Sequence, residues 1–220
     1  MSMNEEITQF LKQRLVSDTG FADCPDSPFD GLQNGISLVF RLSDAVIDQI
    51  TDCPTHTYFQ HYRTTNAYID SVAHQLVLYL MEKGYMAAAV PASQSVNGLQ
   101  GIYSHKKLAV TAGLGSIGKS ALFLSRLYGP RVRLGSVFTN APLDTVCKQQ
   151  EDLCGACDIC AKSCGAMAIK NVNYMCGMAR EDIFDAKACS NYMKEKYKNI
   201  GRGAVCGVCM RVCPYGQNKK

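Results

Sequence analysis

Eight cysteines near the end of the chain constrain its fold more than any other feature. Cys154 opens a run with the spacing Cys-x-x-Cys-x-x-Cys-x-x-x-Cys, and Cys206 opens a second run, Cys-x-x-Cys-x-x-x-Cys-Pro, with Cys189 between them. In bacterial two-cluster iron–sulfur proteins, the first three thiolates of such a run hold one 4Fe–4S cubane and the fourth reaches a second cluster. The two runs therefore predict two 4Fe–4S clusters, each with four cysteine ligands.

The two runs are expected to exchange ligands. We predict that cluster one takes three cysteines of the first run and the last cysteine of the second, namely Cys154, Cys157, Cys160 and Cys213. Cluster two would take the remaining ligands, namely Cys164, Cys189, Cys206 and Cys209. The chain has 12 cysteines, so four lie outside this partition, namely Cys24, Cys53, Cys147 and Cys176. Of these, Cys24 and Cys147 are expected to be ordinary thiols.

A zinc site is the main alternative for these cysteines. Zinc is commonly held by two pairs of Cys or His side chains. Cys157 with Cys160 could form one pair, and Cys206 with Cys209 the other. That assignment leaves three cysteines at cluster spacing without a role, so the cluster interpretation is favoured. Structural disulfides are disfavoured because no secretory signal precedes the cysteines.

Composition bounds the class of protein. The chain has 220 residues, 47% of them hydrophobic, which is enough for one ordinary domain and a small one. Its net charge of +4 is a mild excess that does not by itself call for a nucleic-acid partner. No stretch is long and apolar enough for a membrane span, and the first residues do not resemble a signal peptide. Together with oxygen-sensitive clusters, these features lead us to expect a cytoplasmic protein.

Upstream of the cysteines, strand and helix patterns alternate. Ser2 and Glu5 have the spacing of a capping box, and the helix that follows is expected to stop at Gly20. Residues 21–35 are expected to form a loop. Strands are predicted over residues 36–42, 86–90 and 132–139, and helices over residues 45–50 and 69–80, the second closed by Gly84. The alternation predicts an α/β domain over residues 1–145, followed by a cluster domain over residues 146–220.

A glycine-rich stretch over residues 113–120 matches two nucleotide-binding patterns. The GxGxxG pattern expects an acidic residue about 20 positions later, but the next acid in this chain is Asp144. The GxxxxGK[ST] pattern expects a later strand that ends in an acidic magnesium ligand, but residues 122–139 contain no acid. A nucleotide-dependent protein is therefore disfavoured. We predict a turn whose backbone packs closely against a flat cofactor or a neighbouring helix.

Several motifs, in order, resemble the shared core of epoxyqueuosine reductases and reductive dehalogenases. They are Ala-Gly-Leu-Gly-Ser-Ile-Gly-Lys at 112–119, Gly-Pro-Arg-Val-Arg-Leu-Gly-Ser-Val-Phe-Thr at 129–139, Asp-Ala-Lys-Ala-Cys at 185–189, and the two cysteine runs. The resemblance covers roughly residues 105–215. It implies a nitroreductase-like α/β domain that binds a cobalamin-type corrinoid, and a ferredoxin-like domain with the same interleaved clusters. The corrinoid site would be lined by Gly113, Leu114, Gly115, Ser116, Gly118 and Lys119.

The chain also departs from these families. Epoxyqueuosine reductases have a catalytic Asp thirteen residues before the Ala that matches Ala112, where this chain has Leu99, and they have a Glu at the position of His105. Their helical-repeat domain, which helps to hold tRNA, and the Tat signal of respiratory dehalogenases are not expected here. Gly165, rather than Pro, follows Cys164. Because a reductase needs a proton donor, we predict Tyr103 and His105 as catalytic residues.

These expectations combine into one function and two alternatives. The first is an iron–sulfur reductase that takes electrons from a ferredoxin or flavodoxin and passes them through two clusters to a corrinoid, in order to reduce a small organic substrate or the corrinoid itself. The alternative is an electron-transfer or corrinoid-handling protein without substrate chemistry of its own. Epoxyqueuosine reduction on tRNA is less favoured, and no nucleic-acid partner is expected.

Overall fold

The computed structural model describes residues 2–93, 96 and 98–217, and these divide into two compact units that interleave along the chain. Unit 1 comprises residues 1–41, 65–114 and 133–149. Unit 2 comprises residues 42–64, 115–132 and 150–220. The sequence-based division at residue 145 had grouped 42–64 and 115–132 with the first domain. They join the cysteine-bearing unit because their apolar side chains share its core, as Leu42, Ile50 and Tyr58 do with Val208.

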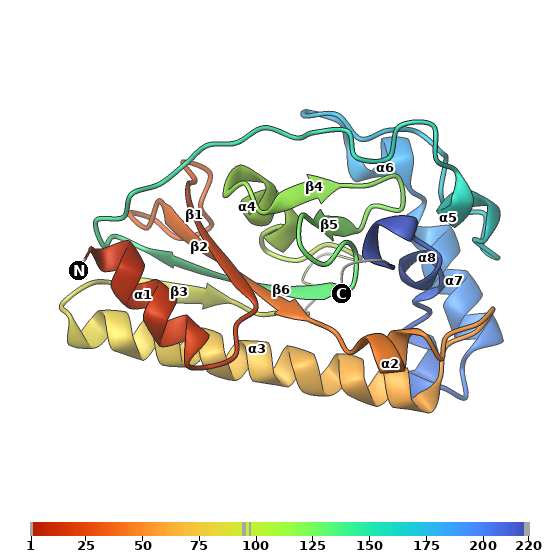
Figure 1. Ribbon diagram of the computed structural model, residues 1–220, viewed down its shortest axis with the longest axis horizontal. Coiled ribbons are helices and arrows are strands. Elements are labelled where there is room, and N and C mark those ends of the chain that lie inside the picture. The colour runs from red at the N-terminus through yellow and green to blue at the C-terminus, as the bar shows by residue number, and fades with distance from the viewer. Residues whose placement is uncertain (1, 94–95, 97, 218–220) are drawn as a thin grey trace. The chain divides into compact units, whose positions relative to one another are not determined.

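Unit 1 is built on a four-stranded sheet with the order β1-β2-β6-β3 (Figure 1). Its strands are β1 (Asp18–Asp23), β2 (Asn34–Arg41), β3 (Ala87–Val90) and β6 (Val132–Thr139). β1 runs antiparallel to β2, and β3 runs antiparallel to β6. The two central strands, β2 and β6, are almost wholly buried, as is typical of apolar runs covered on both faces.

Three helices supply the layers of unit 1: α1 (Met3–Lys12), the part of α3 (His56–Glu82) that follows residue 64, and α4 (His105–Thr111). Ile36, Leu38 and Phe40 of β2 pack into one core with side chains of α1 and α3. The neighbouring residue Gly35 lies against α4, and a Cβ there would be 2.5 Å from Leu108 Cδ1. A glycine in β2 therefore allows α4 to approach the sheet closely.

Most elements predicted for unit 1 are confirmed. The capping box is formed, because Ser2 Oγ accepts from the backbone N–H of Glu5 at 3.3 Å and Glu5 Oε2 accepts from that of Ser2 at 2.8 Å. The three predicted strands correspond to β2, β3 and β6, and the predicted helix over 69–80 lies inside α3, which begins earlier than expected.

Two predictions about the first 35 residues are wrong. The first helix ends at Lys12 rather than Gly20, and residues 21–23 belong to β1 instead of a loop. Phe21 and Ala22 pair with Ile36 and Gly35 of β2. The pairing with a buried neighbouring strand outweighs the turn-forming composition of this segment.

Unit 2 consists of short elements joined by loops. They are α2 (Asp44–Ile47), β4 (Gly115–Ile117), β5 (Phe123–Ser125), α5 (Ile159–Lys162), α6 (Arg180–Ile183), α7 (Ala186–Lys196), η1 (Gly201–Gly203), α8 (Val208–Arg211) and η2 (Pro214–Gly216). β4 and β5 form an antiparallel hairpin. The short predicted helix over 45–50 corresponds to α2.

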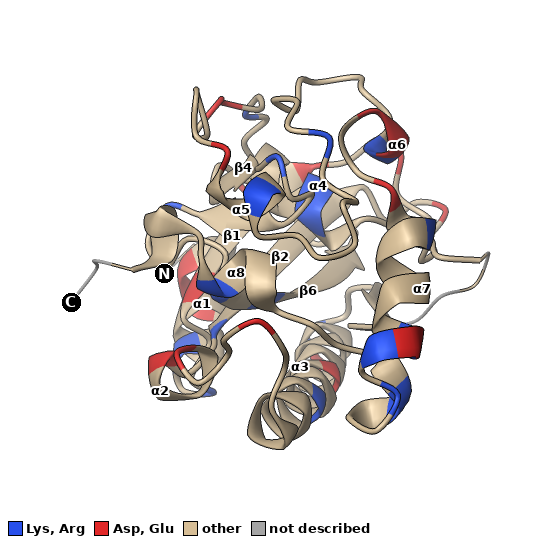
Figure 2. Cartoon of the chain, turned by 90° about the vertical axis from the view of Figure 1, so that its right-hand side faces the viewer, with Lys and Arg blue, Asp and Glu red and all other residues tan. Residues whose placement is uncertain are grey.

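The charges of unit 2 are of mixed sign in its later helices. Lys and Arg occur beside Asp and Glu on both α6 and α7 (Figure 2). Among the described residues, no helix combines the length and apolar character that a bilayer crossing requires.

Candidate metal centre

The first cysteine run is folded into a tight turn. The backbone N–H of Cys157 donates to the carbonyl oxygen of Cys154 at 3.0 Å. Asp152 Oδ1 accepts from the backbone N–H groups of Cys154 at 2.9 Å and Gly155 at 3.0 Å. Gly155 has a φ of +50°, in the left-handed region that favours glycine. The turn therefore brings the thiols of Cys154 and Cys157 to one side of a short loop, as ligands of one cluster require.

The second run is held by a glycine and a short helix. Gly207 has a φ of +83° and precedes α8, which carries Cys209. A Cβ at Gly207 would lie 2.7 Å from Ile50 Cδ1, so the turn into α8 is packed against the unit's core. Cys213 stands immediately before η2, whose first residue is Pro214.

The isolated cysteine, Cys189, lies in the first turn of α7. Asp185 caps this helix, since its side chain accepts from the backbone N–H of Ala188 at 2.8 Å. The backbone N–H of Cys189 donates to the carbonyl oxygen of Asp185 at 3.1 Å. The Asp185–Cys189 motif seen in the sequence is thus a helix start that fixes the position of one thiol.

Most of the thiols that raise the pKa of another thiol belong to the same predicted cluster. Burial, and then the neighbouring thiols of Cys154, Cys160 and Cys157, raise the pKa of Cys213 to about 11. The pKa of Cys160 is likewise raised by burial and then by Cys154 and Cys157. Cys213 therefore lies near Cys154, Cys157 and Cys160, although it is far from them in the sequence.

In the second predicted cluster, too, burial and neighbouring thiols raise the pKa of the cysteines. Burial, and then Cys206 and Cys164, raise the pKa of Cys189 to about 11. Burial also raises the pKa of Cys209, followed by the charges of Cys206, Cys189, Cys160 and Cys164. Cys160 belongs to the first predicted cluster, so the two sets of ligands approach each other at Cys160 and Cys209.

The donor set fits iron–sulfur clusters. All eight cysteines are free thiols. The predicted partition gives each cluster four of them, which is the ligand number of a 4Fe–4S cubane. Thiols with raised pKa values bind metal with loss of a proton. In the described part of the chain, no three His, Cys, Asp or Glu side chains are arranged to hold a single metal ion. A cubane does not require that arrangement, because its thiolates are spread over four irons.

Gly165 stands after the fourth cysteine of the first run, where related sequences have Pro, and its surroundings explain why a small residue is needed. A Cβ at this position would lie 2.4 Å from the hydroxyl oxygen of Tyr192 on α7. Tyr192 in turn stacks edge to face on Tyr197, with ring centroids 5.7 Å apart. Tyr192 therefore fills the space that a larger residue at 165 would need.

The glycine-rich stretch begins as a helix end and continues as a strand. Gly113, with a φ of +77°, follows α4, and its N–H donates to the carbonyl of Val110 at 2.8 Å. Gly115 lies in β4, where a Cβ would be 2.0 Å from the carbonyl oxygen of Leu124. The predicted close backbone packing is confirmed, but its partner is the strand β5. A strand–loop–helix context for nucleotide binding is not formed by these described residues.

The other residues predicted to line a corrinoid are buried. Leu114, Ser116 and Lys119 are 9%, 1% and 5% exposed. A Cβ at Gly118 would meet Leu124 Cδ1 at 2.8 Å and Cys154 Sγ at 3.2 Å, and one at Gly113 would meet Lys148 Cγ at 3.0 Å. The chain itself covers the faces of the three glycines, so these residues do not form an open cradle. Their contact with a corrinoid stays a prediction.

His105, predicted as a proton donor, has both ring nitrogens engaged inside unit 1. Its Nε2 lies 3.0 Å from the carbonyl oxygen of Pro91, and its Nδ1 lies 2.8 Å from the hydroxyl of Ser136. A carbonyl only accepts, so Nε2 carries the proton and Nδ1 accepts from Ser136. Burial, and then the charge of Arg133, lower the pKa of His105. The ring is therefore neutral.

Tyr103 lies in a different polar group from His105. Its hydroxyl donates to Asp26 Oδ1 at 3.5 Å. Lys107 pairs with the same aspartate. Burial, followed by the charge of Cys24, raises the pKa of Tyr103. The two predicted catalytic residues thus have separate partners, and their catalytic role stays a prediction.

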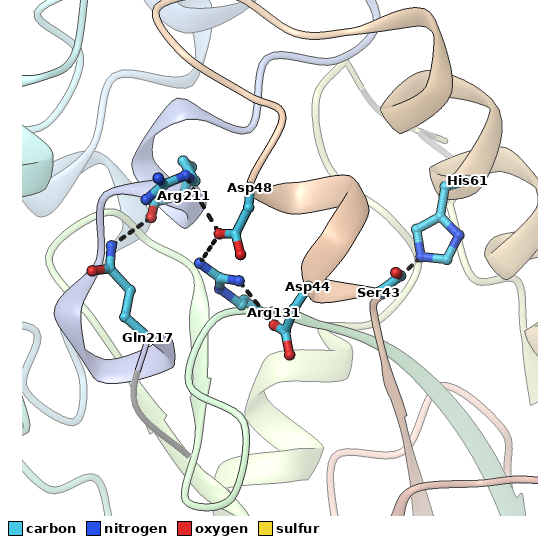
Figure 3. A network of polar contacts seen from close by, with 7 residues as sticks. All are labelled: Ser43, Asp44, Asp48, His61, Arg131, Arg211 and Gln217. Carbon is cyan, nitrogen blue, oxygen red and sulfur yellow. Dashed lines mark hydrogen bonds and ion pairs between the residues drawn. The ribbon is translucent and has the colours of Figure 1, made fainter. Parts of the chain in front are cut away.

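A buried arginine, which the sequence did not single out, anchors the second cysteine run. Arg131 is 3% exposed, and its guanidinium donates to Asp44 and Asp48 at 2.8 Å each (Figure 3). Asp48 also lies 3.5 Å from Nε of Arg211 on α8. The backbone carbonyl of Arg211 accepts from the side-chain amide of Gln217 at 2.8 Å. The network joins α2, α8 and the residues after Cys213. Its only signal in the sequence was the Gly-Pro-Arg motif.

Comparisons with known proteins agree with the cysteine pattern. Residues 153–216 match the family described as a 4Fe-4S double cluster binding domain. The prediction of iron–sulfur binding in this region is therefore confirmed, while the assignment of individual ligands stays a prediction.

Relatives of both expected kinds are found. The epoxyqueuosine reductase of Listeria monocytogenes is 30% identical over 126 residues, which are 53% of this chain and 31% of that protein. The tetrachloroethene reductive dehalogenase of Sulfurospirillum multivorans is 30% identical over 127 residues, 52% of this chain and 24% of that protein. The matched region thus spans about a quarter to a third of the length of these relatives.

Solved structures of both kinds share the fold. A reductive dehalogenase, whose structure suggests a mechanism for B12-dependent dehalogenation, has a TM-score of 0.72 at 17% identity, covering 93% of this chain and 30% of its own. An epoxyqueuosine reductase has a TM-score of 0.64 at 19% identity, covering 99% of this chain and 66% of its own. The predicted resemblance to both groups is confirmed, and so is the predicted α/β fold with a region for two 4Fe–4S clusters.

Proposed function

We propose that this chain is an iron–sulfur oxidoreductase that passes single electrons through two 4Fe–4S clusters to a cobalamin-type corrinoid, for reduction of a small organic substrate or of the corrinoid itself. The observation that carries the proposal is the presence of eight free cysteines at the spacing of two 4Fe–4S clusters. The match of residues 153–216 to a 4Fe-4S double cluster binding domain supports the same proposal of two clusters. When bound, the clusters would supply one-electron transfer and a corrinoid would supply a strongly reducing centre.

The proposed ligands follow the interleaved partition. Cluster one would be held by Cys154, Cys157, Cys160 and Cys213, and cluster two by Cys164, Cys189, Cys206 and Cys209. Cys160 lies on α5 and Cys209 on α8, and Cys160 contributes to the raised pKa of Cys209, after burial, Cys206 and Cys189. We infer that electrons cross between the two clusters at this point.

The donor and the compartment are part of the proposal. A reduced ferredoxin or flavodoxin is the class of protein that supplies single electrons at the low potentials such clusters require. A reducing cytoplasm suits clusters of this kind because it protects them from oxidation. Support for the corrinoid comes from the B12-dependent dehalogenase among the similar structures. No corrinoid contact is assigned to residues 113–119, because the chain covers their glycine faces.

The second candidate is an electron carrier without substrate chemistry of its own. It is favoured because His105 and Tyr103 are poorly suited to donate a proton. The proton of His105 is held by the Pro91 carbonyl, and the raised pKa of Tyr103, caused first by burial, makes its hydroxyl a weaker acid. A protein that only reduces or hands over a corrinoid needs neither group. Reduction of epoxyqueuosine on tRNA is the third and least supported assignment.

The test is a spectroscopic titration of the anaerobically purified full chain with hydroxocobalamin. We expect a cobalamin-dependent change in the visible spectrum, and one-electron reduction of the cobalamin once a reduced flavodoxin is added. The rate should exceed that with flavodoxin alone and should fall in a Cys189→Ala variant. A protein that holds about eight irons but leaves the cobalamin spectrum unchanged would contradict the corrinoid part of the proposal.

The same assay separates the enzyme from the carrier. Tyr103→Phe and His105→Gln should leave cobalamin reduction unchanged in both cases. Slower turnover of an organic substrate in either variant would favour the enzyme. A chain that reduces cobalamin yet turns over no halogenated or epoxide substrate would favour the carrier.

A further inference from the structure

Lys119, which the sequence placed in a corrinoid site, is directed at the first cysteine run instead. Its side chain is buried, and Nζ donates to the carbonyl oxygen of Cys157 at 2.9 Å and to Oδ1 of Asn171 at 3.1 Å. Both acceptors are neutral. Asp158 lies within electrostatic reach of Lys119 but forms its ion pair with Lys162 at 2.8 Å. A positive charge is therefore held inside unit 2 without a carboxylate at ion-pair distance among the described residues.

The backbone around Lys119 contacts a proposed ligand of cluster one. A Cβ at the preceding Gly118 would lie 3.2 Å from Cys154 Sγ, so glycine there permits the approach. The end of the glycine-rich stretch therefore lies directly against this cysteine.

Asn171 fixes the other side of the lysine. It has a φ of +59°, a left-handed conformation that Asn tolerates better than most residues. Asn171 follows the fourth cysteine of the first run, so Lys119 joins three segments: the turn after β4, the loop of Cys157 and the segment after Cys164. Such a fixed position is what a charge needs if it is to act on one neighbour.

We propose that Lys119 is the electrostatic partner of cluster one and raises its reduction potential. The inference rests on the proposed clusters. Reduction adds one electron, and hence one negative charge, to a cluster whose four thiolates already make it anionic. A cation nearby stabilises the reduced form more than the oxidised form, and burial strengthens this effect because the local dielectric is low. The motif that looked like a nucleotide loop is, on this account, part of the surroundings of a cluster.

The experiment is a redox titration of the full chain, with both clusters loaded, followed by electron paramagnetic resonance. Lys119→Met removes the charge and retains the apolar stem, whereas Lys119→Arg retains the charge. Lys162→Met is the matched control, because it removes an exposed charge on α5 in the same cysteine run. We expect Lys119→Met to move one of the two midpoint potentials to a more negative value, Lys119→Arg to restore it, and Lys162→Met to move it less.

Unchanged potentials in a Lys119→Met protein that holds both clusters would overturn the inference and leave the proposed function intact. A wild-type chain with fewer than about four irons would overturn both. If both Lys119 variants lose a cluster, Asn171→Asp decides, since it retains an acceptor for Nζ and adds a negative charge. A more negative potential in Asn171→Asp supports the inference, and an unchanged one overturns it.

Discussion

Single residues in this chain have roles that depend on what surrounds them rather than on their chemical type. His105 and Tyr103 were predicted to deliver protons, yet each is bonded to partners inside unit 1. Lys119 was predicted to contact a cofactor, and its ammonium instead binds a carbonyl and an amide near a cysteine. A one-dimensional pattern shows which polar groups are present, but the partners of these groups come from segments 14 to 77 residues away.

The neutral state of His105 predicts a pH dependence of stability. Its pKa is lowered in the folded chain from an ordinary value of 6.5, mainly by burial. A group whose folded pKa is depressed contributes stability above its unfolded pKa, and that contribution is lost as the pH falls below about 6.5, by up to about 1.4 kcal/mol per pH unit. We expect His105→Gln, whose amide can still donate and accept, to lose less stability than wild type between pH 7 and pH 5.

Urea denaturation at several pH values measures this difference. His74→Gln is the control, because His74 is exposed on α3. It should lose stability on acidification as the wild type does. Parallel losses in wild type and His105→Gln would show that His105 does not carry the effect.

At the scale of elements, a buried arginine links several short pieces that could not be stable alone. α2 and α8 have four residues each, far fewer than an isolated helix needs. Arg131 ties them together through Asp44 and Asp48 (Figure 3). The position of the second cysteine run is therefore set by tertiary contacts and not by helix propensity.

Arg131→Met should destabilise the chain by about 2 to 4 kcal/mol, because two charge-assisted hydrogen bonds at a buried site are lost. Arg211→Met should cost at most about 1 kcal/mol, since its pair with Asp48 is long and partly exposed. Chemical denaturation of both variants provides the comparison. Equal losses would mean that burial of Arg131 does not strengthen the network.

The sequence identified elements whose own residues determine them. The buried strands β2 and β6 follow from apolar runs, and α1 follows from a capping box. It did not identify β1, which depends on pairing with β2, or the β4–β5 hairpin, which depends on Gly115 admitting the backbone of Leu124. The cluster cysteines could be identified from the sequence because a cubane dictates the spacing of its ligands. The contacts of Lys119 and Arg131 could not, because their partners are far away in the sequence.

At the scale of the whole chain, the two units are not consecutive. Residues 42–64 and 115–132 belong to the unit that carries the two cysteine runs, although they precede Cys154, the first cysteine of those runs. Lys119 and Arg131, which contact the cysteine runs or anchor them, both come from the second of these segments. A fragment that begins near residue 146 would therefore lack part of the structure that supports the proposed clusters.

The count of iron and acid-labile sulfide per chain, after anaerobic purification, tests the central claim of two clusters with interleaved ligands most directly. The account predicts about eight of each in wild type. It also predicts an unchanged count in Cys176→Ala, an exposed cysteine outside the partition, and a clear loss in Cys189→Ala. Four or fewer irons in wild type, or a loss in Cys176→Ala with none in Cys189→Ala, would contradict it.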